Sequence, residues 1–206
     1  ERTVRNWCTV GKIPGAFLTG KTWNIPTDAT APKRTKEKVS PLLNRLREEK
    51  EAKLSGGIYH RTQIDLTYNS NHIEGSKLTH EQTRYIFETN TIGITDESVN
   101  VDDIVETTNH FRCIDYIIDH AGDQLTESMI KGLHIILKSG TSDSRKSWFN
   151  VGEYKRLPNE VGGKETCPPE GVHKEMKNLL THYKGIKTKT IENIIDFHCQ
   201  FERIHP

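Results

Sequence analysis

Apolar residues recur at helical spacing along most of this chain of 206 residues. From Ile58 onward they repeat every three or four positions, which predicts a succession of amphipathic helices. Residues 139–173, rich in Gly, Pro, Ser and Asn, are the one clear interruption. The pattern predicts a mostly α-helical body with one loop or hairpin between two helical halves. The clearest helical runs are Ile104, Phe111, Ile114, Ile117 and Ile118; Met129, Leu133, Ile136 and Leu137; and Leu179, Leu180, Ile191, Ile194, Ile195 and Phe197.

The first 40 residues follow a different pattern. Val4, Trp7 and Cys8 share one face of a short helix, which is expected to end at Gly11. Two short apolar stretches flank Thr19-Gly20 and predict a small hairpin. Residues 33–40 are polar and basic, and we expect them to form a linker to the helical body.

Charge also divides the chain, whose formal net charge is +1. Residues 1–50 hold 11 Lys and Arg against 5 Asp and Glu, whereas the remainder holds 18 against 23. This asymmetry suggests two parts with different partners. No apolar run approaches the ~20 residues that a membrane span needs, so we expect no membrane association. The chain opens with neither a signal peptide nor a methionine, which suggests a portion of a longer protein.

Cysteine and histidine usage adds little chemistry of its own. Four scattered cysteines contain no Cys-x-x-Cys pair, and the ten histidines are not clustered like metal ligands. We therefore expect a reducing, cytoplasmic setting and no metal bound by side chains of this chain alone.

Three runs near the start resemble the recognition helix and wing of excisionase-like and MerR-like helix-turn-helix domains. They are Arg-Thr-Val-Arg-Asn-Trp-Cys, then Gly-Lys-Ile-Pro-Gly-Ala, then Trp-Asn-Ile-Pro. The resemblance implies that residues 1–32 are part of a winged helix-turn-helix domain whose first helix precedes Glu1. It also implies DNA contacts from Arg2, Thr3, Arg5 and Asn6. The alternative is a basic cap, held by aromatic residues, on the main body.

The most informative segment closes the chain. His198, Phe201, Ile204, His205 and Pro206 fit the run His-x-x-Phe-x-x-Ile-His-Pro. This run resembles the helix that opens the signature of the Fic (filamentation induced by cAMP) family, which continues Phe-x-Asp/Glu-Gly-Asn-Gly-Arg-x-x-Arg. The resemblance implies that His205 is the catalytic base; the alternative is a surface histidine.

A second segment, Ser70-Asn71-His72-Ile73-Glu74-Gly75, lies over 120 residues upstream. It matches the inhibitory motif of the family, Ser/Thr-x-x-x-Glu-Gly/Asn. The spacing places Ser70 and Glu74 on one helix face, and the inhibitory residues would be Ser70, Glu74 and Gly75. Otherwise, Ser70 is a helix cap and Glu74 a solvated acid.

A third segment, residues 150–167, resembles the flap of the family, a β-hairpin introduced by Gly-x-Tyr-Arg/Lys and closed before Pro-Pro. Exposed backbone groups of such a hairpin can pair with an extended peptide. The resemblance implies a substrate flap made of Leu157, Asn159, Val161, Gly162 and Gly163. Asn109 falls where the family carries a helical Glu-x-x-Asn, and we expect it to be scaffold.

Together these segments imply an all-α, Fic-type helical domain over residues 41–206, incomplete at its C-terminus, with an inhibitory helix near 64–75. The implied activity is that of a protein adenylyltransferase (AMPylator). It transfers AMP from ATP, with Mg²⁺, to a Ser, Thr or Tyr hydroxyl of a target protein or of the enzyme itself. His205 would accept the hydroxyl proton, and Glu74 would inhibit by pairing with the last arginine of the signature.

The phosphate-binding loop and the metal-binding acid of that signature follow His-Pro. A polypeptide that ends at Pro206 is therefore expected to be inactive. The alternatives are a DNA-binding regulator with a non-catalytic Fic-like body, a Fic enzyme that uses another nucleotide or a phosphocholine carrier, and an enzyme that removes AMP. A homo-oligomer is also left open.

Overall fold

The computed structural model of this chain describes residues 2–9, 11–30, 40–93 and 98–206. The expected linker at 33–40 therefore lies outside the described residues, apart from Ser40. Contacts divide the chain into two units, Glu1–Val39 and Ser40–Pro206. Each unit is a compact body with its own internal contacts.

The N-terminal unit is a short helix followed by a hairpin. Its elements are α1 (Arg2–Thr9), β1 (Phe17–Thr19) and β2 (Thr22–Asn24), and the two strands pair antiparallel around Gly20 and Lys21. After α1, Gly11 N–H donates to Cys8 O (3.1 Å) and Lys12 N–H donates to Trp7 O (2.8 Å). This pair of bonds is a Schellman motif, and Gly11 supplies the positive φ (68°) that it requires. The expected helix end and hairpin are both present.

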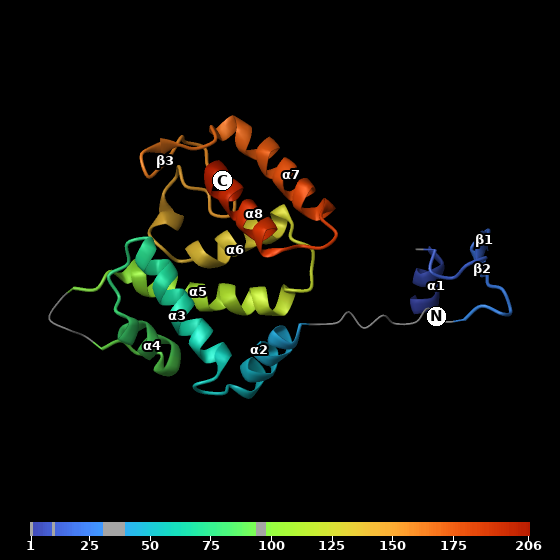
Figure 1. Cartoon of the computed structure of the whole chain (residues 1–206), viewed down its shortest axis with the longest axis horizontal. Coiled ribbons are helices and arrows are strands. Elements are labelled where there is room, and N and C mark those ends of the chain that lie inside the picture. The colour runs from blue at the N-terminus through green and yellow to red at the C-terminus, as the bar shows by residue number, and fades with distance from the viewer. Residues whose placement is uncertain (1, 10, 31–39, 94–97) are drawn as a thin grey trace. The chain divides into compact units, whose positions relative to one another are not determined.

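The second unit is the helical body. Its α-helices are α2 (Pro41–Ala52), α3 (Ile58–Ile73), α4 (His80–Thr89), α5 (Val101–His120), α6 (Glu127–Lys138), α7 (Pro169–Gly185) and α8 (Ile191–Ile204) (Figure 1). A 3₁₀ turn (Asp143–Arg145) and the hairpin strands β3 (Glu160–Val161) and β4 (Lys164–Glu165) lie between α6 and α7. The predicted mostly helical body with one hairpin is confirmed.

Local sequence explains where several of these helices begin. Thr79 and Gln82 form a capping box at α4, in which Gln82 N–H donates to Thr79 Oγ1 (3.1 Å) and Thr79 N–H donates to Gln82 Oε1 (2.9 Å). Thr190 and Asn193 form the same box at α8. Each box satisfies backbone N–H groups that the first turn of a helix leaves free.

The junction between α2 and α3 depends on one buried carboxylate. Glu49 is 3% exposed, and its carboxylate accepts Tyr59 N–H (2.9 Å) and Arg45 Nε–H (2.6 Å). The bond from Tyr59 N–H lowers the pKa of Glu49. A Cβ at Gly57 would lie 2.2 Å from Glu49 Oε2, so only glycine lets the carboxylate reach the N-terminus of α3.

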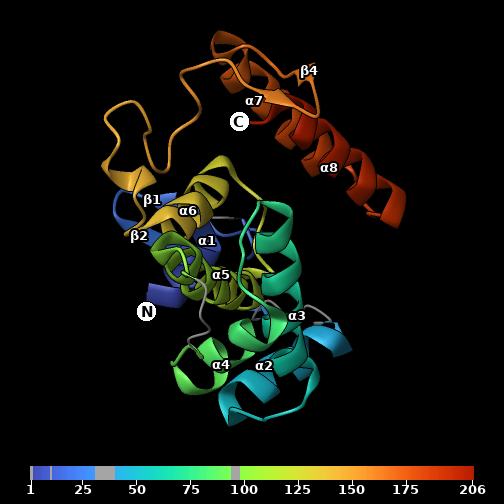
Figure 2. The ribbon, with the colours of Figure 1, turned by 90° about the vertical axis from the view of Figure 1, so that its left-hand side faces the viewer.

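Three groups of buried apolar side chains hold the described helices together. One joins α3 to α5, a second joins α4 to α5, and the third joins α7 to α8. Helix α6 lies between α5 and the α7–α8 pair in both views (Figures 1 and 2). Asn109 fastens α5 to the end of α6, because its Nδ2 donates to Leu137 O (2.9 Å) and Ser139 O (2.7 Å). The geometry suits the scaffold role expected for Asn109.

Among the described residues, we find no helix with the length and apolar character that a membrane crossing requires.

The α7–α8 core generates a stability prediction. Met176 is fully buried against Val172, Leu179 and Ile204. Met176→Ala is expected to lower the free energy of unfolding by about 2–5 kcal/mol, because it removes buried methylene groups and leaves a cavity. The measurement is urea unfolding followed by far-UV circular dichroism. Lys177→Ala, on the exposed face of the same helix, should change the free energy of unfolding by less than about 0.5 kcal/mol; equal effects of the two variants would contradict this packing.

Candidate active site

The end of α8 sets the position of His205. Its N–H donates to Phe201 O (2.8 Å), and its backbone is left-handed (φ 45°, ψ 67°). Such a conformation is uncommon for residues other than glycine. Ile204, one residue earlier, is buried, whereas the imidazole of His205 is 44% exposed. The helix end therefore anchors the backbone in the core and leaves the ring accessible.

The imidazole of His205 lines a cavity of about 580 Å³ whose wall includes Glu74, and we call this space the Glu74 cavity. It lies between the end of α3, α5, α6 and α8, and apolar side chains make up most of its wall. The structure thus brings together two predicted site residues that are far apart in the sequence. The other lining residues are His110, Cys113, Ile117, Leu125, Ile130, Lys131, Leu133, His134, Leu137, Glu153, Tyr154, Phe197, His198, Phe201, Glu202 and Pro206.

The local structure around Glu74 explains the glycine of the predicted motif. Gly75 N–H donates to His72 O (3.1 Å) and Ser76 N–H donates to Asn71 O (2.9 Å), which is a Schellman motif with Gly75 at φ 97°. Glycine is therefore needed to end α3. Glu74 is the capping residue itself, and its exposed carboxylate makes no hydrogen bond or ion pair within the described residues.

The helix that carries the predicted inhibitory motif was expected near 64–75, whereas α3 starts at Ile58 and ends at Ile73. Ser70 lies in its last turn, where the Ser70 carbonyl accepts Glu74 N–H (3.3 Å). Ser70 and Gly75 are not among the residues that line the Glu74 cavity. Of the three predicted inhibitory residues, only Glu74 faces the same space as His205.

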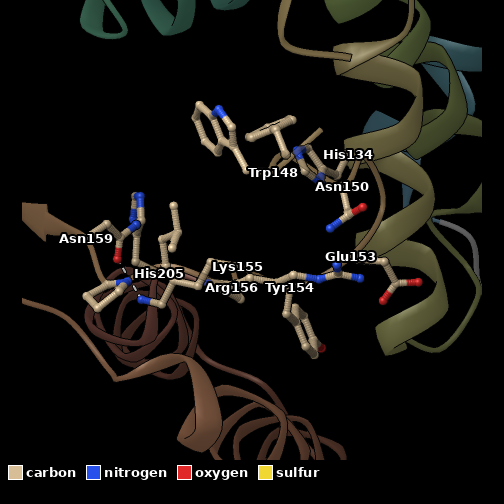
Figure 3. A pocket seen from close by; sticks show the side chains of 13 residues that line it. His134, Trp148, Asn150, Glu153, Tyr154, Lys155, Arg156, Asn159 and His205 are labelled. Carbon is tan, nitrogen blue, oxygen red and sulfur yellow. Dashed lines mark hydrogen bonds between the residues drawn. The ribbon is translucent and has the colours of Figure 1, made fainter. Parts of the chain in front are cut away.

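A second cavity, of about 380 Å³, is also lined by His205, and we call it the flap cavity. Figure 3 shows His205 and Asn159 at one end of it, facing Trp148, His134 and Asn150. His205 therefore stands at the junction of two cavities. The remaining lining residues of the flap cavity are Phe149, Glu153, Tyr154, Lys155, Arg156, Leu157, Pro158 and Pro206.

The hairpin beside this cavity is short. Glu160 pairs with Glu165 and Val161 with Lys164, around the two-residue turn Gly162-Gly163. Both glycines have positive φ (58° and 73°), as a type I′ turn requires. Of the predicted flap residues, Leu157 and Asn159 line the flap cavity, whereas Val161, Gly162 and Gly163 lie outside both cavities.

Lys155 is a site residue that sequence reasoning did not single out. Its Nζ donates to Asn159 Oδ1 (2.7 Å), Thr166 Oγ1 (2.6 Å) and Ile204 O (3.0 Å). Burial lowers the pKa of Lys155. The sequence did contain a signal for Lys155. It is the last residue of the Gly-x-Tyr-Lys run, and it follows Tyr154 just before the hairpin.

His134, on α6, was also missed. Its Nδ1 accepts the backbone N–H of Gly152 (3.2 Å), so the native ring carries no proton on that nitrogen. Burial lowers the pKa of His134. Gly152 has φ 81°, and a Cβ there would lie 2.4 Å from Ile135 Cγ1. The signal that could have found His134 is its position, because it falls at the same helical spacing as the apolar residues of α6.

His110 contributes a further imidazole to the Glu74 cavity. Its Nδ1 lies 2.9 Å from Thr67 Oγ1, and burial lowers its pKa. Across the residues that the structure describes, no group of three or more His, Cys, Asp or Glu side chains has the arrangement to hold a metal ion.

The predicted DNA-contact residues lie in the N-terminal unit. Arg5 and Asn6 are exposed on α1, and Arg5 Nη2 donates to Lys21 O (3.4 Å), which ties the helix to the hairpin. The side chains of Arg2 and Thr3 lie outside the described part of the structure.

Comparisons with known proteins agree with the architecture of the helical body. Residues 124–206 match the model of the Fic/DOC family. Among 30 matching chains of solved structures, one is a Fic domain containing signaling protein from Bacteroides thetaiotaomicron, with 27% identity and a TM-score of 0.60. Another is a Fic family protein from Desulfovibrio desulfuricans, with 21% identity and a TM-score of 0.61. No curated protein matches.

These matches cover 80% and 82% of this chain, which in turn spans 65% and 53% of the two solved chains. Residues 124–206 are therefore similar to Fic/DOC family sequences, and the matched part of the chain has the fold of Fic structures. The resemblance drawn from the closing helix is confirmed at this level.

The two half-buried histidines, His110 and His134, generate a pH prediction. Folding lowers the pKa of each of these histidines below its ordinary value of 6.5. At a pH below about 6.5, the unfolded chain therefore binds more protons at these rings than the folded chain does. Stability should therefore fall as the pH drops below about 6.5. The free energy of unfolding measured in urea should be lower at about pH 5.5 than at about pH 7.5. Both pH values lie above the range in which most carboxylates titrate, so carboxylates should contribute little to the difference.

The double variant His110→Asn/His134→Asn keeps an acceptor at each Nδ1 position and should flatten this dependence. His80→Asn, which replaces an exposed histidine, should leave it in place. Equal pH dependence in the wild type and the double variant would show that these two rings do not cause it.

Proposed function

We propose that the protein carrying this chain transfers AMP from ATP to a hydroxyl group of a protein, with His205 as the base and Glu74 as an inhibitory residue. The observation that supports this most strongly is the single cavity lined by both Glu74 and His205. The Fic/DOC match over residues 124–206 supports the class of reaction.

In this proposal the nucleotide occupies the Glu74 cavity, and the acceptor hydroxyl approaches from the flap cavity. The apolar wall that includes Ile117, Leu133 and Leu137 suits a planar base. Bound ATP with Mg²⁺ supplies an electrophilic α-phosphorus and, in pyrophosphate, a leaving group. In the family, an acid that follows His-Pro in the signature holds Mg²⁺ together with the phosphates, and the same arrangement is proposed here.

His205 then has a defined task. As the hydroxyl oxygen of the acceptor bonds to phosphorus and the bond to pyrophosphate breaks, the imidazole accepts the hydroxyl proton. Imidazole is the side chain suited to this transfer near neutral pH. Its place at the junction of the two cavities is the position that a base between nucleotide and acceptor must occupy.

Glu74 has an exposed carboxylate at the mouth of a cavity, without a partner among the described residues. A carboxylate so placed is available for a bidentate pair with an arginine. In the family this partner is the last arginine of the signature, which otherwise binds the terminal phosphate. The proposed inhibition is thus a competition between Glu74 and the nucleotide for one guanidinium.

The test uses the protein that carries this chain together with the complete signature after Pro206. Incubated with labelled ATP, the Glu74→Gly variant should incorporate at least about tenfold more label into itself, the factor that one charge-assisted hydrogen bond supplies. His205→Ala in the same background should lower incorporation by about 10²–10⁴-fold, the usual contribution of a general base. Labelled UTP and GTP in parallel reactions test the choice of nucleotide.

Asp123→Gly is the matched control, because Asp123 is another exposed acid just after a helix end and lies outside both cavities. It should leave incorporation unchanged. An unaltered rate in Glu74→Gly would sink the inhibitory role, and full incorporation by His205→Ala would sink the role of the base.

A second activity, DNA binding by the N-terminal unit, is favoured by the exposed Arg5 and Asn6 on α1 and by the adjoining hairpin. We propose that α1 contacts the DNA major groove and that the hairpin contacts the backbone. The basic balance of the first 50 residues suits binding to phosphates.

Fluorescence anisotropy of the intact protein on labelled duplex DNA tests this activity. Arg5→Ala should weaken binding, and if Arg5 contacts a phosphate the slope of log affinity against log salt should fall by about one. Lys53→Ala, an exposed cation of the helical body, should change neither value. Equal losses in the two variants would argue against a contact through α1.

A further inference from the structure

The C-terminal turn of α8 is completed by groups from the base of the flap. The last carbonyls of a helix have no partner within the helix. Here Arg203 O accepts the backbone N–H of Cys167 (3.1 Å), and Ile204 O accepts Lys155 Nζ (3.0 Å). We call this set of contacts the flap–α8 joint. It lies one residue before His205.

Lys155 is the centre of this joint. An ammonium group has three N–H donors, and the three acceptors within reach are Asn159 Oδ1, Thr166 Oγ1 and Ile204 O. All three acceptors are neutral, so they orient the lysine without an ion pair. A cation at the C-terminus of a helix is also favoured by the helix dipole.

The base of the flap is itself closed at the same place. Thr166 N–H donates to Asn159 O (3.2 Å), and Thr166 Oγ1 also contacts Asn159. Lys155 therefore bonds to both sides of the hairpin base and to the helix end at once. Figure 3 shows the Lys155–Asn159 bond beside His205.

The position of His205 depends on this arrangement. A residue other than glycine in the left-handed region costs free energy, and it persists only when its surroundings hold it there. His205 directly follows the capped carbonyls of α8, and it lines the flap cavity together with the segment from Lys155 to Asn159. The joint thus couples the ring of His205 to the edge along which an acceptor would bind.

We propose that Lys155 is a positioning residue, which fixes the distance and orientation between His205 and the flap so that an acceptor hydroxyl meets the imidazole. In this proposal Lys155 acts through Ile204 and the base of the hairpin, because its three ammonium donors already bond there. The kinetic part of this inference rests on the proposed transfer activity, whereas the structural part does not.

Amide hydrogen exchange of this chain, followed by mass spectrometry with single-residue resolution, tests the structural part. In Lys155→Met, which keeps most of the aliphatic stem, the amides of Cys167, Thr166 and His205 should exchange about tenfold faster, as expected for the loss of a hydrogen bond from a charged group. Amides of α3 and α5 should be unchanged. Lys164→Met is the matched control, because Lys164 is an exposed lysine of the same hairpin, and it should change none of these rates.

The kinetic part uses the intact protein in the Glu74→Gly background. Lys155→Met should lower kcat by about 100-fold, the cost of a misplaced catalytic group, and should leave the KM for ATP within about threefold. Lys155→Arg also provides a cation with several donors, and it should restore most of kcat. A lysine with a general stabilising role would instead lower the melting temperature and speed exchange throughout α7 and α8.

The outcomes separate the two claims. Faster exchange at the joint with no transfer activity in any protein, the parent included, would refute the proposed function and leave the joint intact. Unchanged exchange in Lys155→Met, or an unchanged kcat in an active parent, would overturn the positioning role. If Lys155→Met does not fold, Thr166→Val removes one acceptor, keeps the lysine and should speed exchange at the same amides; unaltered rates there would refute the joint.

Discussion

The hydrogen bonding of backbone groups at helix ends is the constraint on which this site depends. A helix leaves its last carbonyls free, and each must find a partner or face water. At the end of α8, Phe201, Arg203 and Ile204 obtain partners from His205, Cys167 and Lys155. Because two of these partners belong to the flap base, closing the helix also attaches the flap. The ring of His205 is placed as a result of that closure.

Glu74 and His205 both lie at the C-terminal caps of their helices. The C-terminal end of a helix carries partial negative charge, so the Glu74 cavity receives this charge from α3 and α8. Lys131, the lysine of the cavity, is already paired with Glu153 (2.9 Å) and Glu127 (3.3 Å). Anionic phosphates would therefore depend on further cations, and the arginines that follow His-Pro in the family signature would supply them.

Sequence periodicity was sufficient for most of the fold. The helical body, the hairpin and the end of α1 at Gly11 all follow from local rules, because capping residues and glycines act within one turn of where they stand. The span expected for the helix that carries the predicted inhibitory motif, near 64–75, was less accurate, because α3 runs from Ile58 to Ile73. A four-residue spacing shows that Ser70 and Glu74 share a helix face, but the Schellman bonds around Gly75 make Glu74 a cap and leave Ser70 outside the cavity.

The sequence alone was enough to identify His205 and Glu74 as candidates, through a short run and its distance from a second motif. It could not show that they share a cavity, because that depends on how α3, α5, α6 and α8 are arranged in the fold. Lys155 and His134 were missed for the same reason. Their partners, Ile204 O and Gly152 N–H, are backbone atoms of residues distant in the sequence. Every residue except proline carries both of these backbone groups, so the pattern of side chains does not indicate which of them will be the partner. Local chemistry determined the elements, and only tertiary packing decided which helix ends face one another across a common space.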